Sequence, residues 1–153
     1  MRVFVEVRGF GQIKSGFSQF GRLAQEPQPI LEAVAERAFY PIVQEIFDSE
    51  GRGRWPENTP AYEEAKTKKY GDRPIMQATT ALVTSLTKKN ATMNIHTAQG
   101  RNSLLLGSAI HYSRFASKRR PVLMFGQPDF NRMGQEATKE FKDRGRGLGF
   151  QVK

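Results

Sequence analysis

The residues of this 153-residue chain that are best suited to binding are basic, and they cluster in its second half. One run places four positive charges within seven residues, with no acid among them: Arg114, Lys118, Arg119 and Arg120. Such a run repels itself unless it is solvated or matched to negative charge, so we expect it to face solvent or a partner. It predicts either docking on an acidic protein surface or sequence-independent contact with nucleic-acid phosphates.

The charge of the whole chain follows the same asymmetry. Residues 1–76 carry eleven Lys and Arg against eleven Asp and Glu, whereas residues 77–153 carry thirteen against four. The formal net charge of +9 therefore lies entirely in the second half. The further basic residues there include Lys88, Lys89, Arg101, Lys142, Arg144 and Arg146. They form one positive face if a predicted loop at 99–102 and the segment 118–120 point the same way. A merely soluble basic surface fits the composition as well as an acidic or nucleic-acid partner does.

Residues that could perform catalysis are few. The carboxylate clusters, Glu63–Glu64 and Asp48 with Glu50, fall on polar helix or turn surfaces, where solvated charge is the usual role. His111 precedes a tyrosine and a serine, but no acid lies near it in sequence to orient its ring. We expect no enzymatic activity.

Cofactor and metal sites are also not predicted. The chain has no Cys and two His, which excludes disulfides and thiolate metal sites. Lys14 and Ser15 follow two glycines, as in a phosphate-binding loop, but Ile13 stands where that motif requires Gly. No nucleotide site is expected there.

The size and composition predict one globular domain. About 150 residues are enough to bury a core without covalent cross-links, and 38% of the residues are hydrophobic. No run reaches the ~18 apolar residues of a membrane-spanning helix, and the first eight residues lack a signal-peptide core. We expect one α+β domain at 1–143, with no membrane partner and a loose basic tail at 144–153.

Hydrophobic periodicity predicts the elements of that domain. A strand is expected around Val3–Val7, and a helix from Pro29 to Phe47 should be kinked near Phe39–Tyr40, just before Pro41. The remaining expected elements are helices at 61–70 and 77–87, a β-hairpin between 93 and 106, a helical turn at 110–116, a short strand or extended segment at 121–125, and a helix from 128 to 143. The sequence thus predicts a small mixed sheet that includes a β-hairpin, packed by the long kinked helix and the C-terminal helix.

Residues 8–28 combine glycines with phenylalanines and show neither helical nor strand periodicity, which predicts a flexible arm. Because exposed phenylalanines are unusual in a monomer, we expect Phe10, Phe17 and Phe20 to pack against this subunit or a neighbouring one.

A family pattern accumulates from Trp55 onward. A long amphipathic helix ends at Ile46–Phe47, and a Gly/Arg turn then leads to Trp55–Pro56 and Thr59. The later pieces are, in order, a Lys-rich stretch, Pro74-Ile75-Met76, Thr79-x-x-Leu82-x-x-Ser85-Leu86, a hairpin ending Leu106-Gly107-Ser108, then Tyr112, and finally Arg120-Pro121-x-Leu123. Their order and spacing from about Ile30 to Phe141 resemble the tailed-phage virion morphogenesis family, which includes tail completion proteins of contractile-tailed phages.

Two positions depart from that pattern. The family usually has Gly after the Thr that opens the second helix, where this chain has Thr80. It also tends to have a His and a Gly shortly after the Tyr, where this chain has Ala116 and Ser117.

The resemblance implies a structural virion protein with no enzymatic activity and no cofactor. It implies a homo-oligomeric ring, a hexamer, at the phage neck or tail end, where it acts as head–tail connector or tail terminator. The expected partners are neck, portal-side or tail-tube proteins with transient DNA contact, and the expected locations are the virion and, during assembly, the host cytoplasm. Its fold-defining positions carry over to Trp55, Leu82, Tyr112 and Pro121. The alternative is a sequence-independent nucleic-acid-binding protein that uses the basic C-terminal half.

Overall fold

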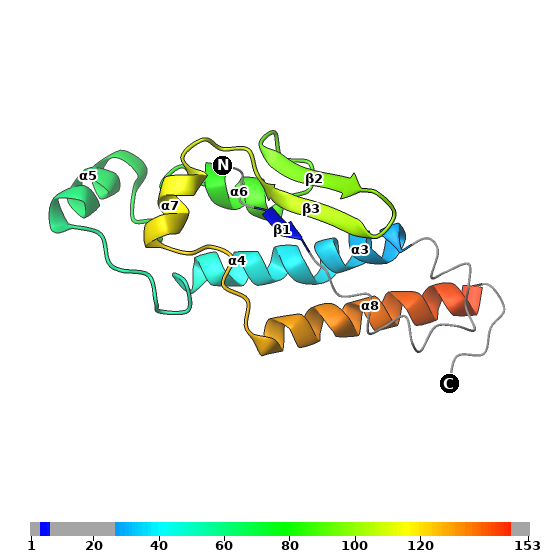
Figure 1. The fold of residues 1–153 in the computed structure, drawn as a ribbon. Helices are drawn as coiled ribbons and strands as arrows, with labels where there is room; N and C mark the ends of the chain where they lie inside the picture. The colour runs from blue at the N-terminus through cyan, green and yellow to red at the C-terminus, as the bar shows by residue number, and fades with distance from the viewer. Residues whose placement is uncertain (1–3, 7–26, 148–153) are drawn as a thin grey trace. The chain divides into compact units, whose positions relative to one another are not determined.

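The computed structural model describes residues 4–6 and 27–147 and has an α+β fold, as the sequence predicted (Figure 1). Its strands are β1 (Phe4–Glu6), β2 (Asn94–Gln99) and β3 (Ser103–Ser108), in the sheet order β1-β3-β2. Its helices are α3 (Gln28–Val34), the π-helix η1 (Ala35–Phe39), α4 (Tyr40–Asp48), α5 (Pro60–Tyr70), α6 (Ala81–Thr87), α7 (Ser113–Arg119) and α8 (Gln127–Gly147). None of these helices combines the length and the apolar character needed to cross a bilayer.

The predicted break before Pro41 takes the form of a π-helical turn. Proline has no N–H to donate, and its ring collides with the carbonyl group one turn earlier in an α-helix. The chain widens into η1 over Ala35–Phe39 and returns to α-helical geometry at Tyr40. A π-turn relieves such a mismatch by adding one residue to the turn, so the helical segment continues through the proline.

The chain divides into two compact units, each assembled from separate stretches. Unit 1 comprises Tyr40–Ile95 and Gly107–Met124 among the described residues. Unit 2 comprises residues 4–6, 27–39, 96–106 and 125–147 of them. The prediction of a single domain over 1–143 stays a prediction.

Unit 2 is held by a helix pair and by the hairpin. Helix α8 packs on α3 and η1, and its apolar face buries Met133, Ala137 and Phe141. Arg37 donates a 2.8 Å hydrogen bond to Glu140 Oε2, an ion pair that joins η1 to α8. Across the hairpin, the Gln28 side-chain amide donates to the carbonyl oxygens of Gly100 and Ser103. In the described part of this unit, α3 therefore contacts both α8 and the hairpin.

Unit 1 is built around α4 and the turn that follows it. Helix α4 packs against α6, and its buried side chains are Tyr40, Ile42, Val43, Ile46 and Phe47. The Gln77 amide donates to the last-turn carbonyl of Phe47, and the Glu50 carboxylate accepts the N–H of Ile75. These two hydrogen bonds hold the segment before α6 to the end of α4.

Several predicted boundaries differ from the structure. Helix α6 begins at Ala81 rather than at residue 77, because Met76 and Thr80 have left-handed backbone conformations that no α-helix contains. Helix α7 starts three residues later than predicted. No strand forms at 121–125, although Val122 is buried there. Residues 144–147 belong to α8 rather than to a loose tail. Residues 148–153 and most of the predicted arm lie outside the described residues, and Gln28 opens α3.

The departure at Thr80 has a measurable consequence. Thr80 is the N-cap residue of α6 and has φ +56°. In this left-handed region, any residue other than Gly costs about 1–2 kcal/mol. Glycine at this position removes that strain but increases the freedom of the unfolded chain. We therefore expect Thr80→Gly to raise the free energy of unfolding by about 0.5–1 kcal/mol. Urea denaturation measures it, with Thr79→Gly as the control. That control should be destabilised, because Thr79 has no positive φ. Equal losses in both variants would contradict the strain at Thr80.

Candidate docking site

An open groove on unit 1 runs between α5 and α7, which lie near one another in Figure 1. Its volume is about 370 Å³. Helix α5 contributes Tyr62 and Tyr70 to the lining, and α7 contributes Phe115 and Arg119. The remaining lining residues are Asn58, Met76, Ala78, Thr79, Leu82, Tyr112, Ala116 and Arg120. The groove is thus apolar and aromatic, with guanidinium groups in its wall.

The aromatic rings of this groove are exposed. Phe115 keeps 66% of its surface exposed, Tyr62 keeps 53% and Tyr112 keeps 37%. Single exposed apolar residues are ordinary on a protein surface, but three large ones around one groove are typical of an interaction site. Interface cores are enriched in tyrosine, phenylalanine, methionine and arginine, and all four types line this groove.

A chain of hydrogen bonds fixes the wall of the groove. The Arg120 guanidinium donates to Pro56 O at 2.6 and 2.9 Å and to Asn58 Oδ1 at 2.9 Å. Asn58 in turn donates to Glu63 Oε2 at 2.6 Å. The Trp55 indole donates to Pro121 O at 2.9 Å. The end of α7 is therefore tied to the Trp55 turn, and that turn is tied to α5.

The same chain of hydrogen bonds continues to a buried lysine. The Lys66 side chain is 3% exposed, and its ammonium contacts Glu63 Oε1 at 2.5 Å and donates to Arg73 O at 2.6 Å. A buried ammonium must be paired to avoid a large desolvation cost, and Glu63 pairs it. The hydrogen bond from Lys66, followed by that from Asn58, lowers the pKa of Glu63 below its ordinary value.

This lowered pKa sets the sign of a pH dependence. A carboxyl group whose pKa is lower in the folded state stabilises the fold above its ordinary pKa of 4.5, and this stabilisation is lost as the pH falls. The measurement is urea unfolding of wild type and Glu63→Gln between pH 7 and pH 3. At pH 7, the wild-type protein should have the larger free energy of unfolding. The difference should shrink below about pH 4.5. Glu64→Gln, which removes the exposed neighbouring carboxylate, is the control, and a gap that stays constant with pH would contradict the pairing.

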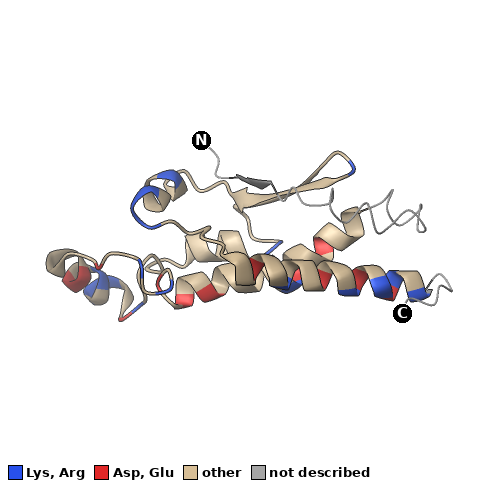
Figure 2. Ribbon diagram, turned by 60° about the horizontal axis from the view of Figure 1, so that its bottom comes forward, with Lys and Arg blue, Asp and Glu red and all other residues tan. Residues whose placement is uncertain are grey.

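The structure separates the four basic residues of the predicted cluster into two groups. Arg114, Lys118 and Arg119 are exposed on α7, whereas Arg120 is half-buried and binds its own chain. Figure 2 shows basic positions in blue on α7 and on the segment that follows it. Three of the four basic side chains are thus available to a partner, whereas Arg120 holds the end of α7 to the segment that contains Pro56 and Asn58.

The other predicted site residues are also placed. Trp55 and Leu82 are buried, whereas Tyr112 lies on the groove and Pro121 is exposed and supplies its carbonyl to the indole. The Tyr112 ring also makes an edge contact with His111, at 5.4 Å between ring centroids. Phe10, Phe17 and Phe20 lie outside the described residues.

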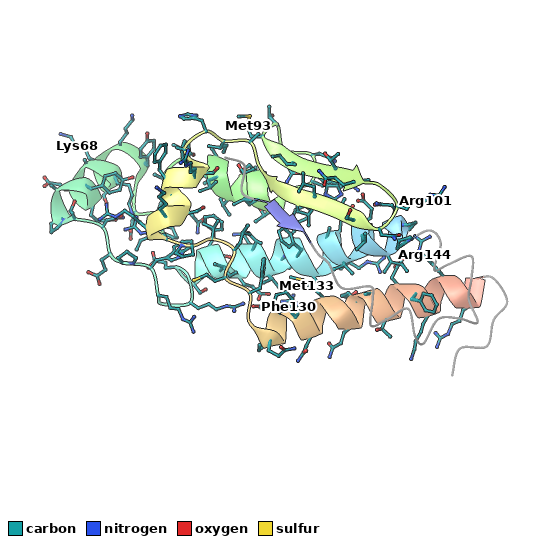
Figure 3. The ribbon with its side chains drawn as sticks, in the orientation of Figure 1. Lys68, Met93, Arg101, Phe130, Met133 and Arg144 are labelled. Atoms are coloured by element: carbon teal, nitrogen blue, oxygen red, sulfur yellow. The ribbon has the colours of Figure 1, made fainter. Side chains whose placement is uncertain are left out.

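The single positive face expected from the sequence involves both units. Arg101 at the hairpin tip and Arg144 near the end of α8, both labelled in Figure 3, belong to unit 2. Arg144 is paired with Glu140 Oε1 at 2.7 Å. The α7 cluster belongs to unit 1, so the one-face arrangement stays a prediction.

Sequence reasoning missed the aromatic wall that α5 supplies. Tyr62, Lys66 and Tyr70 recur every four residues, the spacing that places side chains on one helix face. That spacing was the available signal. The helix was interpreted as polar because lysines and glutamates fill its other positions.

A second cavity in unit 1 contains titratable groups. Its volume is about 570 Å³, and its lining includes Glu50, Glu57, Glu63, Lys66, Asp72 and Arg73. Within the described ranges, no group of three or more acids or histidines is arranged to hold a metal ion. The expectations of no enzymatic activity and no cofactor stay predictions.

No protein-family model, curated protein or solved structure matches this chain significantly. The case for a function therefore rests on the residues and geometry described above.

Proposed function

We propose that this chain is a structural subunit of a tailed-phage particle at the neck or tail end, either head–tail connector or tail terminator, acting by ring assembly and docking. The observation that carries the proposal is the open groove between α5 and α7, which combines exposed aromatic rings with arginines. Such a surface is costly to leave in water and gains free energy when a partner covers it.

Several of the positions that carry the family resemblance lie in or beside this groove. Met76, Leu82 and Tyr112 line it, although they come from separate motif segments. Trp55 and Pro121, from two further segments, are joined by a hydrogen bond that holds the α7 wall. Five positions of a pattern that runs from about Ile30 to Phe141 thus lie in or beside one surface, as expected if this part of the pattern preserves a docking site.

Ring assembly is tested by sedimentation velocity of the purified full chain without nucleic acid. A ring joins one patch of each subunit to a different patch of the next, and closure limits its size. We expect one closed species to replace the monomer as concentration rises. A monomer at every concentration, or open-ended polymers, would contradict the proposal.

Docking is tested in particles of the phage that encodes the chain. Replacing Arg114, Lys118 and Arg119 with Ser should leave the protein folded but yield heads and tails that do not join. Arg120 is left intact because it binds Pro56 O and Asn58. A normal yield of joined, infectious particles from the variant would remove the docking role.

The alternative, sequence-independent nucleic-acid binding, is favoured by one observation. Aromatic rings from α5 and α7 stand beside exposed cations, the combination with which proteins stack bases and hold phosphates. Under this alternative, affinity for duplex DNA or oligo(dT) should fall steeply between ~50 and ~200 mM salt. Such binding by a chain that stays monomeric would replace the proposed function.

A further inference from the structure

The groove between α5 and α7 is shaped for an anchoring side chain. Its 370 Å³ volume lies at the small end of the range of ligand pockets, about 300–1,000 Å³. Met76, Ala78 and Leu82 provide apolar contact surface. The tyrosines of α5 and Tyr112, the residue that precedes α7, provide rings with hydroxyl groups. An apolar or aromatic side chain inserted here would be contacted by both helices.

The charge beside this pocket has one sign on the α7 side. The stretch Gly107–Met124 contains four basic residues and no acid. Arg119 is in the pocket wall, and Arg114 and Lys118 are exposed on the same helix. On α5, Lys68 and Lys69 occupy the last turn, and Figure 3 marks Lys68 on that helix. Complementary potentials guide partner choice, so the occupant should be acidic.

Other features favour a polypeptide over a nucleic-acid strand. Arg120 already binds Pro56 O and Asn58, which leaves Arg119 as the exposed guanidinium in the described wall. On the α5 side, Glu64 is exposed and would repel a continuous phosphate backbone. A peptide can place acids toward α7 and an apolar residue in the pocket, because its side chains differ along the strand.

We infer that this groove binds an acidic segment of a partner protein through an aromatic or large apolar anchor residue. The anchor occupies the pocket beside Met76 and Leu82, and the flanking carboxylates meet Arg119 and its α7 neighbours. This inference rests on the proposed function, since it identifies the chemistry of the docking partner.

The test uses the full chain and a fluorescein-labelled twelve-residue peptide with one central Phe, in which Glu and Asp lie on one side of the Phe and Ser and Gly lie on the other. We expect saturable binding in fluorescence anisotropy, and a loss of at least about tenfold when the peptide Phe is replaced by Ser. Arg119→Glu should weaken binding by at least about tenfold as well, the loss typical of an interface arginine. Lys139→Glu makes the same charge change on α8 and should stay within about twofold.

Three outcomes would overturn the inference. The first is no binding of the acidic peptide to a folded chain. The second is tighter binding of a dT12 oligonucleotide with the same dependence on Arg119, which assigns the groove to nucleic acid. The third is dissociation of the ring by the peptide, which makes a second copy the occupant. Ring assembly is measured separately by sedimentation, so a failed peptide test leaves the proposed function standing.

Discussion

Replacing Trp55 with Ala is expected to lower the free energy of unfolding by about 3–5 kcal/mol, the usual loss for a buried aromatic residue. The indole is 6% exposed and packs edge-on against Phe47, with 5.4 Å between the ring centroids. Truncation leaves a cavity beside α4 and deprives Pro121 O of its donor. Urea denaturation measures the loss.

Trp55→Phe separates the two contributions. It keeps a ring against Phe47 but removes the hydrogen bond, whose net worth is about 0.5–1.5 kcal/mol. Because Phe is also smaller than Trp, its total loss should fall between that value and the loss from Ala. A Trp55→Ala protein with near-wild-type stability would contradict the packing of the buried indole against Phe47.

Gly51→Ala should lower the free energy of unfolding about as much as Trp55→Ala does, for a different reason. Gly51 has φ +70°, and a Cβ atom there would lie 2.3 Å from Trp55 Cδ1 and 2.4 Å from Nε1. The indole is held by its hydrogen bond to Pro121 O, so it cannot move aside without breaking that bond. We expect a loss of about 3 kcal/mol or more, combining backbone strain with overpacking.

Gly53→Ala is the matched control, because it has the same backbone strain without the clash. Gly53 has φ +71°, and nothing lies within 4 Å of its added Cβ. Its loss should be about 1–2 kcal/mol, the cost of a left-handed conformation for a residue with a side chain. Equal losses in the two variants, measured by urea denaturation, would show that the indole does not pack on Gly51.

Periodicity was sufficient for the elements with regular patterns. The apolar spacing of 29–47 and the alternation in the hairpin residues correspond to observed helices and strands. Pro41 marked the break, because a missing N–H acts locally and can be recognised from one residue. The α+β class followed from these elements alone.

The predicted and observed elements differ where an unusual backbone conformation, or a contact between residues far apart in the sequence, determines the local structure. The late start of α6 depends on the left-handed Met76 and Thr80, and residues with side chains give no sequence signal for that conformation. The apolar run at 121–125 predicts a strand or an extended segment, and no strand forms there. The Pro121 carbonyl accepts a hydrogen bond from the Trp55 indole, sixty-six residues away in the sequence.

The candidate site was predicted in part. The basic run on α7 was visible as a local charge cluster, and its position in unit 1 follows from the structure. Two facts could be established only from the structure. The tyrosines of α5 line the same groove, and Arg120 donates hydrogen bonds to its own chain. Both depend on contacts between residues more than forty positions apart, which no local pattern contains.

The central claim is that this chain is a structural subunit at the neck or tail end of a phage particle. A cryo-electron microscopy map of the particle in which we propose that this chain is assembled tests this most directly. We predict a ring of copies at the head–tail junction or tail terminus, with α7 covered by an acidic surface of a neighbouring protein. A complete neck and tail end in which other proteins account for all of the density would contradict the claim.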